Sequence, residues 1–553
     1  MRNSAYCLCL LALACGDDST LPVFDAGAPD AFDAGRDVLV MDVGTDAAAD
    51  TPDVPLVPTC DDPAHTYRAF QAGEGSLAYG EIAGDFRLSE VGGGNFGFAE
   101  SFSGCDSYVF INHAGDASST QVFNGFVDQL LEASARNVHY FFSSYERDDE
   151  VRIPLLEGIR ASIDETLARI SADEREHWTP RLHVVAGTVQ GIDGSAGAFL
   201  RAIGTRERAF AIDRGQRFDP VGSLAAITGA GFVSRLPMAG YASHYYNYKA
   251  SLEERVAEED AAGVTTTVLF DEADVTAREH LITIELPEDI GTHQVEVDVQ
   301  LVCHENPAEC SEWDRIAALH VCRDEACEAS DELVRWITPY SRPGERRWLI
   351  DATDRAGLLQ AGLTTFRLVL GPTWERATPR DVRIALRSHP DVAGATTVLP
   401  LFRGGNFDAE YNGTHPPVNV AAPPSASRVE LVVLISGHGQ TGGDNCAEWC
   451  NHTHRFTLNA AGETHEVSFP SGIGSPLGCA ERSSEGVIPG QYGNWAPLRA
   501  GWCPGEPVHP HVFDVTDQVV LGGENTIEYV GSIGGGEPRG GSIELSSYLV
   551  FYP

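Results

Sequence analysis

The sequence predicts a mainly β protein in which two β-sandwiches of jelly-roll type follow an α/β domain and a disordered tether. Three observations lead to this fold class. From residue 263 onward, short segments of alternating apolar and polar residues are separated by turn residues, as in antiparallel sandwiches. Residues 60–262 alternate strand-like and helix-like stretches. Residues 16–59 carry too few large apolar side chains to offset the entropy of ordering.

The first 15 residues resemble the signal peptide of a bacterial lipoprotein. Arg2 precedes an apolar run, and Cys15 follows that run directly. The resemblance implies that Cys15 is lipidated and becomes the first residue of the exported chain. Gly16 is typical of lipoproteins sent onward, so we expect the chain at the outer membrane or cell surface. The alternatives are an ordinary signal peptide cleaved nearby or a short membrane anchor, although the run is too short to span a bilayer.

The tether at 16–59 is rich in Asp, Ala, Pro and Gly, and its like charges favour an extended chain. The whole sequence has 80 acidic against 38 basic residues and a formal net charge of -42. Such a charge repels phosphate backbones and anionic lipid head groups. We therefore expect no nucleic-acid partner, and contact with a membrane through the lipid anchor only.

The α/β domain at 60–262 is expected to be thioredoxin-like. Its pattern predicts strands at 108–112, 139–142 and 182–186 and helices at 122–135, 153–170 and 252–262. That order resembles thioredoxin-like domains, whose redox cysteines follow the first core strand. This chain has residues 113–118 there, without a thiol. We therefore expect no redox activity, and interpret Cys60 with Cys105 as a structural disulfide.

The C-terminal half is expected to hold the two sandwiches. Its alternating segments predict strands at 280–286, 293–302, 365–370, 382–386 and 429–435. A division near 400–405 gives one sandwich at 263–400 and a second at 401–553.

The cysteines indicate an oxidising compartment. Of the 13 cysteines, those after the leader form an even set, and none of them makes a Cys-x-x-Cys motif. Three close pairs suit small disulfide loops in an exported protein: Cys303 with Cys310, Cys322 with Cys327, and Cys446 with Cys450. Structural zinc, the competing interpretation, usually needs Cys-x-x-Cys hooks and is disfavoured.

Two acidic motifs carry the strongest functional signal. They are Cys-Ser-Glu-Trp-Asp-Arg at 310–315 and Asn-Cys-Ala-Glu-Trp-Cys at 445–450. Further strings at 337–340, 350–354, 436–437, 453–454 and 493–505 follow in the same order and with similar gaps as in the peptide-N-glycosidase F family. Residues 263–553 thus resemble that family. The resemblance implies two jelly rolls and an amidase that releases N-linked glycans from glycoproteins or glycopeptides without a cofactor.

Hydrolysis of an amide needs an activated water or nucleophile, a donor for the developing oxyanion, and a proton for the leaving nitrogen. Trp313 and Arg315 flank Asp314, and the first could raise the pKa of its carboxyl while the second lowers it. Sequence alone leaves that balance open, and favours a surface salt bridge. The resemblance implies that Asp314 is the principal catalytic carboxylate, either as the base that activates water or as the nucleophile, with Glu448 as the second acid and Arg499 in the same cleft.

The resemblance also implies residues that bind the substrate. Indole faces can stack on sugars, and a guanidinium can bind sugar or carbonyl oxygens. We expect substrate contacts from Trp313, Arg315, Trp374, Glu375, His438 and Trp502. The family disulfides carry over as Cys303 with Cys310, Cys446 with Cys450, and Cys479 with Cys503, which leaves Cys322 with Cys327 as an addition.

Two departures from the family concern the cleft. Pro372 stands where the family has a glutamate, and Glu375 is our hypothesis for a substitute. His438 stands where the family has a tryptophan after Ser-Gly, and Gln440 follows where a histidine is usual. Glycan preference and rate are therefore expected to differ from those of the family.

Two other functions compete with the amidase. A surface lectin would keep the cleft without cutting, and Pro372 is the best argument for it. A copper monooxygenase would use histidine pairs, for which 452–454 and 509–511 are candidates, but the chain has only 3 methionines to serve as copper ligands. We expect N-glycosylated proteins or glycopeptides as partners, a monomer, and no metal.

Overall fold

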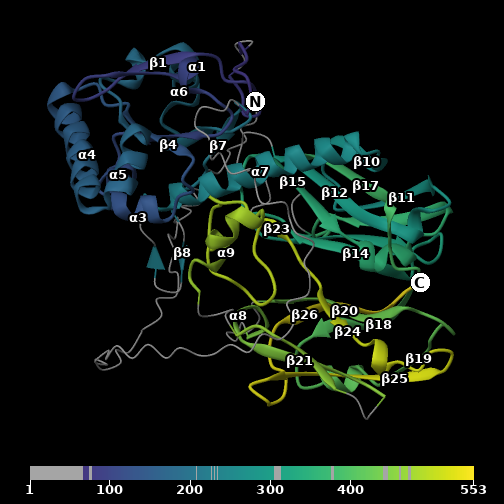
Figure 1. The fold of residues 1–553 in the computed structure, drawn as a ribbon. Helices are drawn as coiled ribbons and strands as arrows, with labels where there is room; N and C mark the ends of the chain where they lie inside the picture. Colours follow the sequence, from purple (N-terminus) through teal and green to yellow (C-terminus); the bar gives the residue numbers. More distant parts are fainter. Residues whose placement is uncertain are drawn as a thin grey trace, which may run out of the picture. The chain divides into compact units, whose positions relative to one another are not determined.

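The computed structural model describes most of the chain from residue 67 onward (Figure 1). The described residues are 67–73, 77–206, 208–225, 227–228, 231–232, 235–303, 313–374, 379–439, 446–459, 463–470 and 475–553. The predicted signal peptide and tether, with Cys15 and Cys60, lie outside them. Strands dominate from residue 265 to the C-terminus, which confirms the mainly β fold class. None of the described helices is long and apolar enough to cross a membrane.

A five-stranded mixed sheet forms the centre of the α/β domain. Its order is β5-β4-β3-β6-β7, with β3 (Ser107–His113), β4 (Val138–Ser144), β5 (Leu182–Val184), β6 (Ala209–Ile212) and β7 (Phe218–Pro220). β3, β4 and β5 are parallel, whereas β6 and β7 are antiparallel to their neighbours. Every residue of β3 and β4 is buried. Strands buried on both faces have continuous apolar sequences, and the predicted segments show that pattern.

Helices pack on both faces of this sheet, because alternate side chains of a strand point to opposite sides. Ile111 and Phe142 share a core with Ile159 of α4, while Phe110 and Phe141 share another with Phe199 of α6. α4 and α5 lie side by side next to β4 (Figure 1). The helices of the domain are α1 (Phe98–Ser101), α2 (Ala117–Phe123), α3 (Val127–Glu132), α4 (Asp149–Arg169), α5 (Ala172–Trp178), α6 (Gly194–Ile203) and α7 (Met238–Ala261), with short strands β1 (Phe86–Ser89), β2 (Asn95–Gly97), β8 (Ile227–Thr228) and β9 (Gly231–Phe232).

The helix predicted at 122–135 is wrong as a single element, because the structure has two short helices, α2 and α3, there. The break falls at Gly125, where an added Cβ would lie 2.6 Å from the Cβ of Leu236. This close approach to a distant segment cannot be read from local periodicity. After β3, where thioredoxin-like domains carry their redox cysteines, Asp116 caps α2 by accepting a hydrogen bond from Ser119 N at 2.7 Å. The thioredoxin-like resemblance stays a prediction.

The first sandwich consists of two antiparallel sheets. One has the order β10-β17-β12-β15, with β10 (Thr265–Val275), β17 (Arg380–Ala393), β12 (His293–Cys303) and β15 (Gly344–Asp351). The other has the order β11-β16-β13-β14-β23, with β11 (Glu279–Leu286), β16 (Gly362–Val369), β13 (Ile316–Cys322), β14 (Ser330–Ile337) and β23 (Glu506–Pro507). Val297 and Val299 of β12 share a core with Leu319 and Phe366 of the opposite sheet.

The second sandwich repeats this architecture as a jelly roll of two four-stranded sheets. One has the order β18-β26-β20-β24, with β18 (Thr397–Asn406), β26 (Ser542–Tyr552), β20 (Arg428–His438) and β24 (His511–Asp514). The other has the order β19-β25-β21-β22, with β19 (Val418–Ala421), β25 (Glu524–Ile533), β21 (His452–Leu458) and β22 (Thr464–Ser468). Two short helices, α8 (Cys446–Trp449) and α9 (Gly478–Glu481), lie in its connections.

Helix α7 joins the α/β domain to the first sandwich through ion pairs. Arg255 bonds both Glu259 and Glu296, and Arg387 of β17 lies 3.0 Å from Glu259. His389 also lies 3.1 Å from Glu296. Within the described residues, Glu259, Glu296 and His389 form the cluster whose spacing would suit a metal ion. Because two arginines already neutralise its carboxylates, we interpret the cluster as structural.

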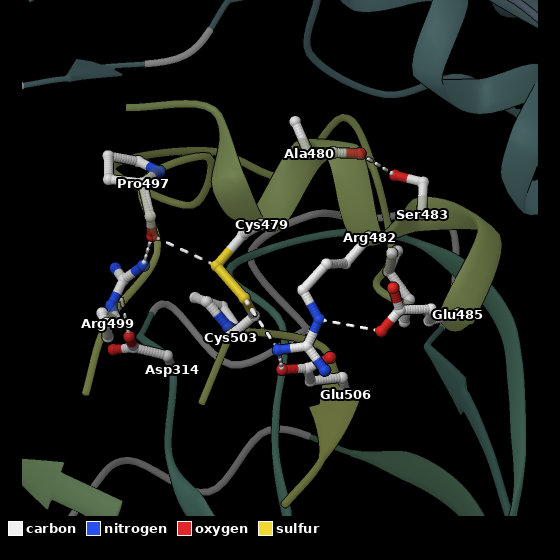
Figure 2. Close-up of a disulfide and its surroundings, with 12 residues drawn as sticks. Asp314, Cys479, Ala480, Arg482, Ser483, Glu485, Pro497, Arg499, Cys503 and Glu506 are labelled. Carbon is white, nitrogen blue, oxygen red and sulfur yellow. Dashed lines mark hydrogen bonds and ion pairs between the residues drawn. A yellow bond between two sulfur atoms is a disulfide. The ribbon is translucent and has the colours of Figure 1, made fainter. Parts of the chain in front are cut away.

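Strand β23 is contributed by the C-terminal half of the chain to the first sandwich, where Glu506 pairs with Ile337. The Glu506 side chain is fully buried beside Arg482 at 3.0 Å (Figure 2). Its Oε2 has no hydrogen-bond partner among the described residues. Burial therefore raises the pKa of Glu506 to about 8, although Arg482 opposes the shift.

We expect Glu506→Gln to be more stable relative to wild type at pH 9 than at pH 5. A carboxyl whose pKa is raised on folding stabilises the folded state at low pH. For Glu506 this stability is lost as the pH rises from the pKa of the unfolded chain to the folded pKa of about 8. At pH 5 the wild-type group is protonated and resembles glutamine, whereas at pH 9 it is a buried anion. Thermal denaturation of both proteins at the two pH values measures the effect. A variant with the same difference from wild type at both pH values would contradict it.

Candidate active site

A cleft of about 750 Å³ lies between β13, β14 and β16 of the first sandwich and β18, β20 and β26 of the second. It brings together residues from segments far apart in the sequence. Those singled out from the sequence and found in its lining are Trp313, Asp314, Arg315, Pro372, His438, Glu448 and Trp502. Trp374, also expected at the cleft, has its ring 5.0 Å from the Arg315 guanidinium.

Asp314 lies just before β13, where the strand meets the end of β14. Arg315 N donates to Thr338 Oγ1 and Thr338 N donates to Arg315 O, both at 2.8 Å, which fixes the backbone next to Asp314. The carboxyl is largely shielded from solvent. Burial raises its pKa, while Arg499 and a hydrogen bond from the Tyr340 hydroxyl oppose the rise. The charge of the neighbouring Arg315 opposes the rise as well, so Asp314 is a carboxyl held in a desolvated place with two arginines near it.

Glu448 lies in α8, and close packing against β20 fixes that helix. A Cβ on Gly437 would lie 1.8 Å from Ala447 O, so only glycine allows this approach. Burial raises the pKa of Glu448 to about 7; the Asp314 charge adds to the rise and Arg499 opposes it. Burial thus raises the pKa of both acids, and that of Glu448 lies close to neutral pH.

Arg499 connects the two acids from a position 1% exposed. Its Nε lies 3.2 Å from Glu448 Oε1. Its Nη2 lies 3.6 Å from Asp314 Oδ2, and Figure 2 shows these two side chains next to each other. Nη1 donates to Pro497 O at 2.9 Å, Nη2 donates to Tyr340 Oη at 3.2 Å, and Nη2 also donates to Asn494 O. Because the guanidinium is held on several sides, its position does not depend on the substrate.

Comparisons with known proteins identify one family. Residues 406–550 match the family model described as "Peptide-N-glycosidase F, C terminal". The chain is 31% identical over 265 residues to peptide-N(4)-(N-acetyl-beta-D-glucosaminyl)asparagine amidase F of Elizabethkingia miricola, covering 45% of this chain and 70% of that protein. The chain belongs to the peptide-N-glycosidase F family.

Several solved structures are also similar to this chain. PNGase F of Flavobacterium meningosepticum is 24% identical with a TM-score of 0.39, covering 52% of this chain and 96% of that protein. A second amidase structure, at 2.2 Å resolution, is 26% identical with a TM-score of 0.40 and covers 52% and 96%. PNGF-II is 15% identical with a TM-score of 0.41 and covers 54% and 68%.

The cleft tryptophans of this peptide-N-glycosidase F family member differ in exposure. Trp313 lines the cleft and is 49% exposed, whereas Trp374, which is 76% exposed, lies beside Arg315 and is not among the lining residues. Trp502, expected to stack on a sugar, is only 3% exposed. His438 stacks on its ring at 4.8 Å, and the Arg499 guanidinium lies 4.7 Å from its centroid. Trp502 therefore supports Arg499 and His438 rather than offering a free face to the substrate.

The disulfides hold the segments that carry the site. The structure contains Cys479–Cys503 and Cys322–Cys327. The Cys479 sulfur lies 3.1 Å from Pro497 O, the carbonyl that also accepts from Arg499 (Figure 2). Cys450 and Cys105 are disulfide-bonded as well. The other predicted partners lie outside the described side chains: Cys60, Cys310 and Cys446. Cys303 is buried at the end of β12.

Tyr340 is a site residue to which the sequence motifs did not point. Arginine can only donate, so Tyr340 Oη accepts from Arg499 and its own proton goes to Asp314. The available signal was its place in the family string at 337–340. Glu375, the hypothetical substitute for the family glutamate, lies outside the described residues. Pro372 lines the cleft and brings no titratable group there.

A buried chain of hydrogen bonds supports α8 from behind. His452 Nε2 lies 2.8 Å from Ala447 O, which only accepts, so this nitrogen carries the proton. His452 Nδ1 then accepts from His454 Nε2 at 2.6 Å, and His454 Nδ1 accepts from Tyr529 Oη at 2.7 Å. Tyr411 Oη lies 2.8 Å from Tyr529 Oη and donates to it. Burial keeps both imidazoles neutral by lowering their pKa.

The same hydrogen bonds argue against a copper site at 452–454. Each ring nitrogen of the two histidines already donates or accepts a hydrogen bond, so neither ring has a lone pair to offer a metal without breaking the chain. The pair at 452–454 is therefore a structural element behind α8.

We expect Tyr529→Phe to destabilise the protein by roughly 1–3 kcal/mol, because it leaves the buried His454 Nδ1 without a donor. Tyr411→Phe is the matched control: it removes only the last donor of the chain and should cost less. Urea denaturation of the two variants compares them. Equal destabilisation would contradict the direction of donation inferred for the chain.

Proposed function

We propose that this chain releases N-linked glycans from glycoproteins or glycopeptides by hydrolysing the asparagine side-chain amide. The observation that carries the proposal is the pair of buried carboxyls, Asp314 and Glu448, on either side of one arginine. Such a group can supply a base, an acid and a fixed positive charge within one desolvated cleft. Family membership supports the same chemistry.

Asp314 acts as the base in this proposal. The ionised carboxylate takes a proton from a water molecule, and the resulting hydroxide attacks the carbonyl carbon of the asparagine side chain. A tetrahedral intermediate forms, and its oxyanion is stabilised by the positive charge of the Arg499 guanidinium, which is buried beside the two carboxyls and held by Pro497 O and Tyr340 Oη. Tyr340 keeps the Asp314 oxygens oriented.

Glu448 supplies the proton that the leaving nitrogen needs. With a pKa of about 7 it is protonated in a large fraction of molecules at neutral pH, close to the value that makes an acid most effective. Donation to the nitrogen breaks the C–N bond. One water is consumed, and the products are a peptide with aspartate in place of asparagine and a glycosylamine. Trp313 and Trp374 offer exposed indole surface for sugars.

The chain is further proposed to be an exported monomer, lipid-anchored at Cys15 to the outer membrane or cell surface. The signal-like leader and the acidic tether support the proposal. It predicts that the full chain, made in a bacterium that exports it, labels with a fatty acid, and that Cys15→Ser does not.

A glycan-binding protein that does not cut is the second candidate. Pro372 favours it, because this residue lines the cleft where the family has a glutamate. The deciding experiment incubates the full chain with a denatured N-glycoprotein and determines the products by mass spectrometry. Conversion of asparagine to aspartate with release of glycan supports the amidase. Glycan retained on the protein but not released supports the second candidate.

A further inference from the structure

His438 ends strand β20 and lines the cleft next to Trp502. Its ring stacks on the Trp502 indole with a centroid distance of 4.8 Å and an angle of 24° between planes. Trp502 Nε1 in turn donates to Gly437 O at 2.7 Å, which fixes the indole. The imidazole is therefore held flat against a fixed surface, with a limited choice of orientations.

The hydrogen bonds behind His438 determine which nitrogen carries its proton. Arg335 Nη1 lies 2.9 Å from Ser436 Oγ and can only donate to it. Ser436 is fully buried, and its hydroxyl has one proton to give. Within the described residues, the acceptor that the geometry offers to this proton is His438 Nε2, at 2.7 Å. Nε2 therefore accepts, and in a neutral ring the proton lies on Nδ1.

The surroundings keep the ring neutral. Burial lowers the pKa of His438 well below its ordinary value, and the charges of Arg335 and Arg499, with His452, add to this effect. Negative charges would favour a protonated ring, and the carboxyls of Asp314, Glu448 and Glu544 line the same cleft. Burial raises the pKa of all three carboxyls, which weakens their attraction for an imidazolium.

Nδ1–H is thus the one donor that His438 has left to offer. No acceptor for it is present among the hydrogen bonds of the described residues, in contrast to both nitrogens of the buried pair His452 and His454. A polar hydrogen in a substrate cleft is costly when desolvated without a partner. A ligand that enters this cleft would have to supply the acceptor.

We propose that His438 is a specificity-determining residue whose Nδ1–H donates a hydrogen bond to the acetamido carbonyl oxygen of the N-acetylglucosamine attached to asparagine. The inference rests on the proposed function, which places this sugar beside Asp314 and Glu448. A group that can only donate selects a group that can only accept. Sugar hydroxyls donate as well as accept, whereas the acetamido oxygen only accepts and is the strongest acceptor of the sugar.

Two substitutions separate this role from a structural one. His438→Asn places an amide nitrogen near the position of Nδ1 and loses the contact with Ser436. His438→Gln reaches the position of Nε2 and keeps the contact with Ser436, but has no donor where Nδ1 was. A merely structural histidine would tolerate glutamine better than asparagine, whereas the proposed donor reverses that order.

Binding of N,N′-diacetylchitobiose to the full-length protein, measured by titration calorimetry, tests the proposal without turnover. We expect His438→Gln to weaken binding about tenfold and His438→Asn to stay within about threefold of wild type, as the loss of one hydrogen bond implies. Equal loss in the two variants, no loss in either, or a larger loss in His438→Asn would overturn it. Thermal denaturation checks that both variants are folded.

The acceptor is tested with the same disaccharide carrying trifluoroacetyl groups, whose carbonyl oxygens accept hydrogen bonds more weakly. Wild type should bind it several-fold more weakly than the parent sugar, and His438→Gln should distinguish the two sugars less. Equal discrimination by both proteins would overturn the acetamido assignment. Because these measurements need binding only, a wild-type protein that binds the sugar but releases no glycan would refute the proposed amidase and leave the His438 result intact.

Discussion

Asp314→Asn is expected to reduce glycan release by about a thousandfold or more, because an amide cannot take a proton from water. The Asn side chain has nearly the same shape and can still accept from Tyr340, so the cleft should keep its form. The measurement compares the release rates of wild type and variant on a denatured N-glycoprotein by mass spectrometry. A variant that retains a tenth of the wild-type rate would show that the base is another residue.

The same substitution should not destabilise the fold at pH 8. Burial raises the pKa of Asp314, so its ionised form is disfavoured in the folded state. Stability from such a carboxyl is fully present below its unfolded pKa and is lost as pH rises through its folded pKa. Asparagine does not ionise, so the stability of the variant relative to wild type should increase as pH rises from 4 to 8. Thermal denaturation at both pH values separates loss of chemistry from loss of fold.

Much of the fold follows from patterns that the sequence displays. The strands of the two sandwiches alternate apolar and polar residues, and β12, β17 and β20 appear where that alternation predicts them. Local patterns failed where distant segments decide the outcome. The break between α2 and α3 depends on Gly125 meeting Leu236, and α7 begins at Met238 rather than near 252 because its first turns are buried against the α/β domain.

For the candidate site, too, the sequence predicted some features and not others. Asp314, Glu448 and Arg499 were predicted by resemblance of short strings to a family, and the structure places them together. Their charge states could not be predicted, because the balance between burial and the Arg499 charge depends on residues brought in by folding. Trp502 illustrates the limit: a tryptophan in a family motif suggested sugar stacking, but Arg499 and His438 cover it.

Arg499→Met is expected to reduce turnover about a thousandfold and to displace its pH dependence to higher pH. Arg499 opposes the rise in pKa of both Asp314 and Glu448, so its loss lets both pKa values rise further. For Glu448 the apparent pKa should move above its present value of about 7. The direction is the same whether Glu448 acts as an acid or as an anion, which makes the shift a test of Arg499 itself.

Arg499→Lys is the matched control, because it keeps the positive charge and loses the planar guanidinium group with its three nitrogens. The guanidinium contacts Glu448, Asp314 and Pro497 O with three different nitrogens, and the single nitrogen of lysine cannot take all three places. A loss of about a hundredfold is therefore expected, with a smaller shift of the pH profile. Arg499→Met should also lose roughly 3–5 kcal/mol of stability at pH 8, where the two carboxyls would lose the cation that lies between them, and less at pH 4, where they are protonated. If Arg499→Met keeps a pH profile with its midpoint near 7 and the same stability difference at both pH values, the charge coupling among these three side chains does not govern the site.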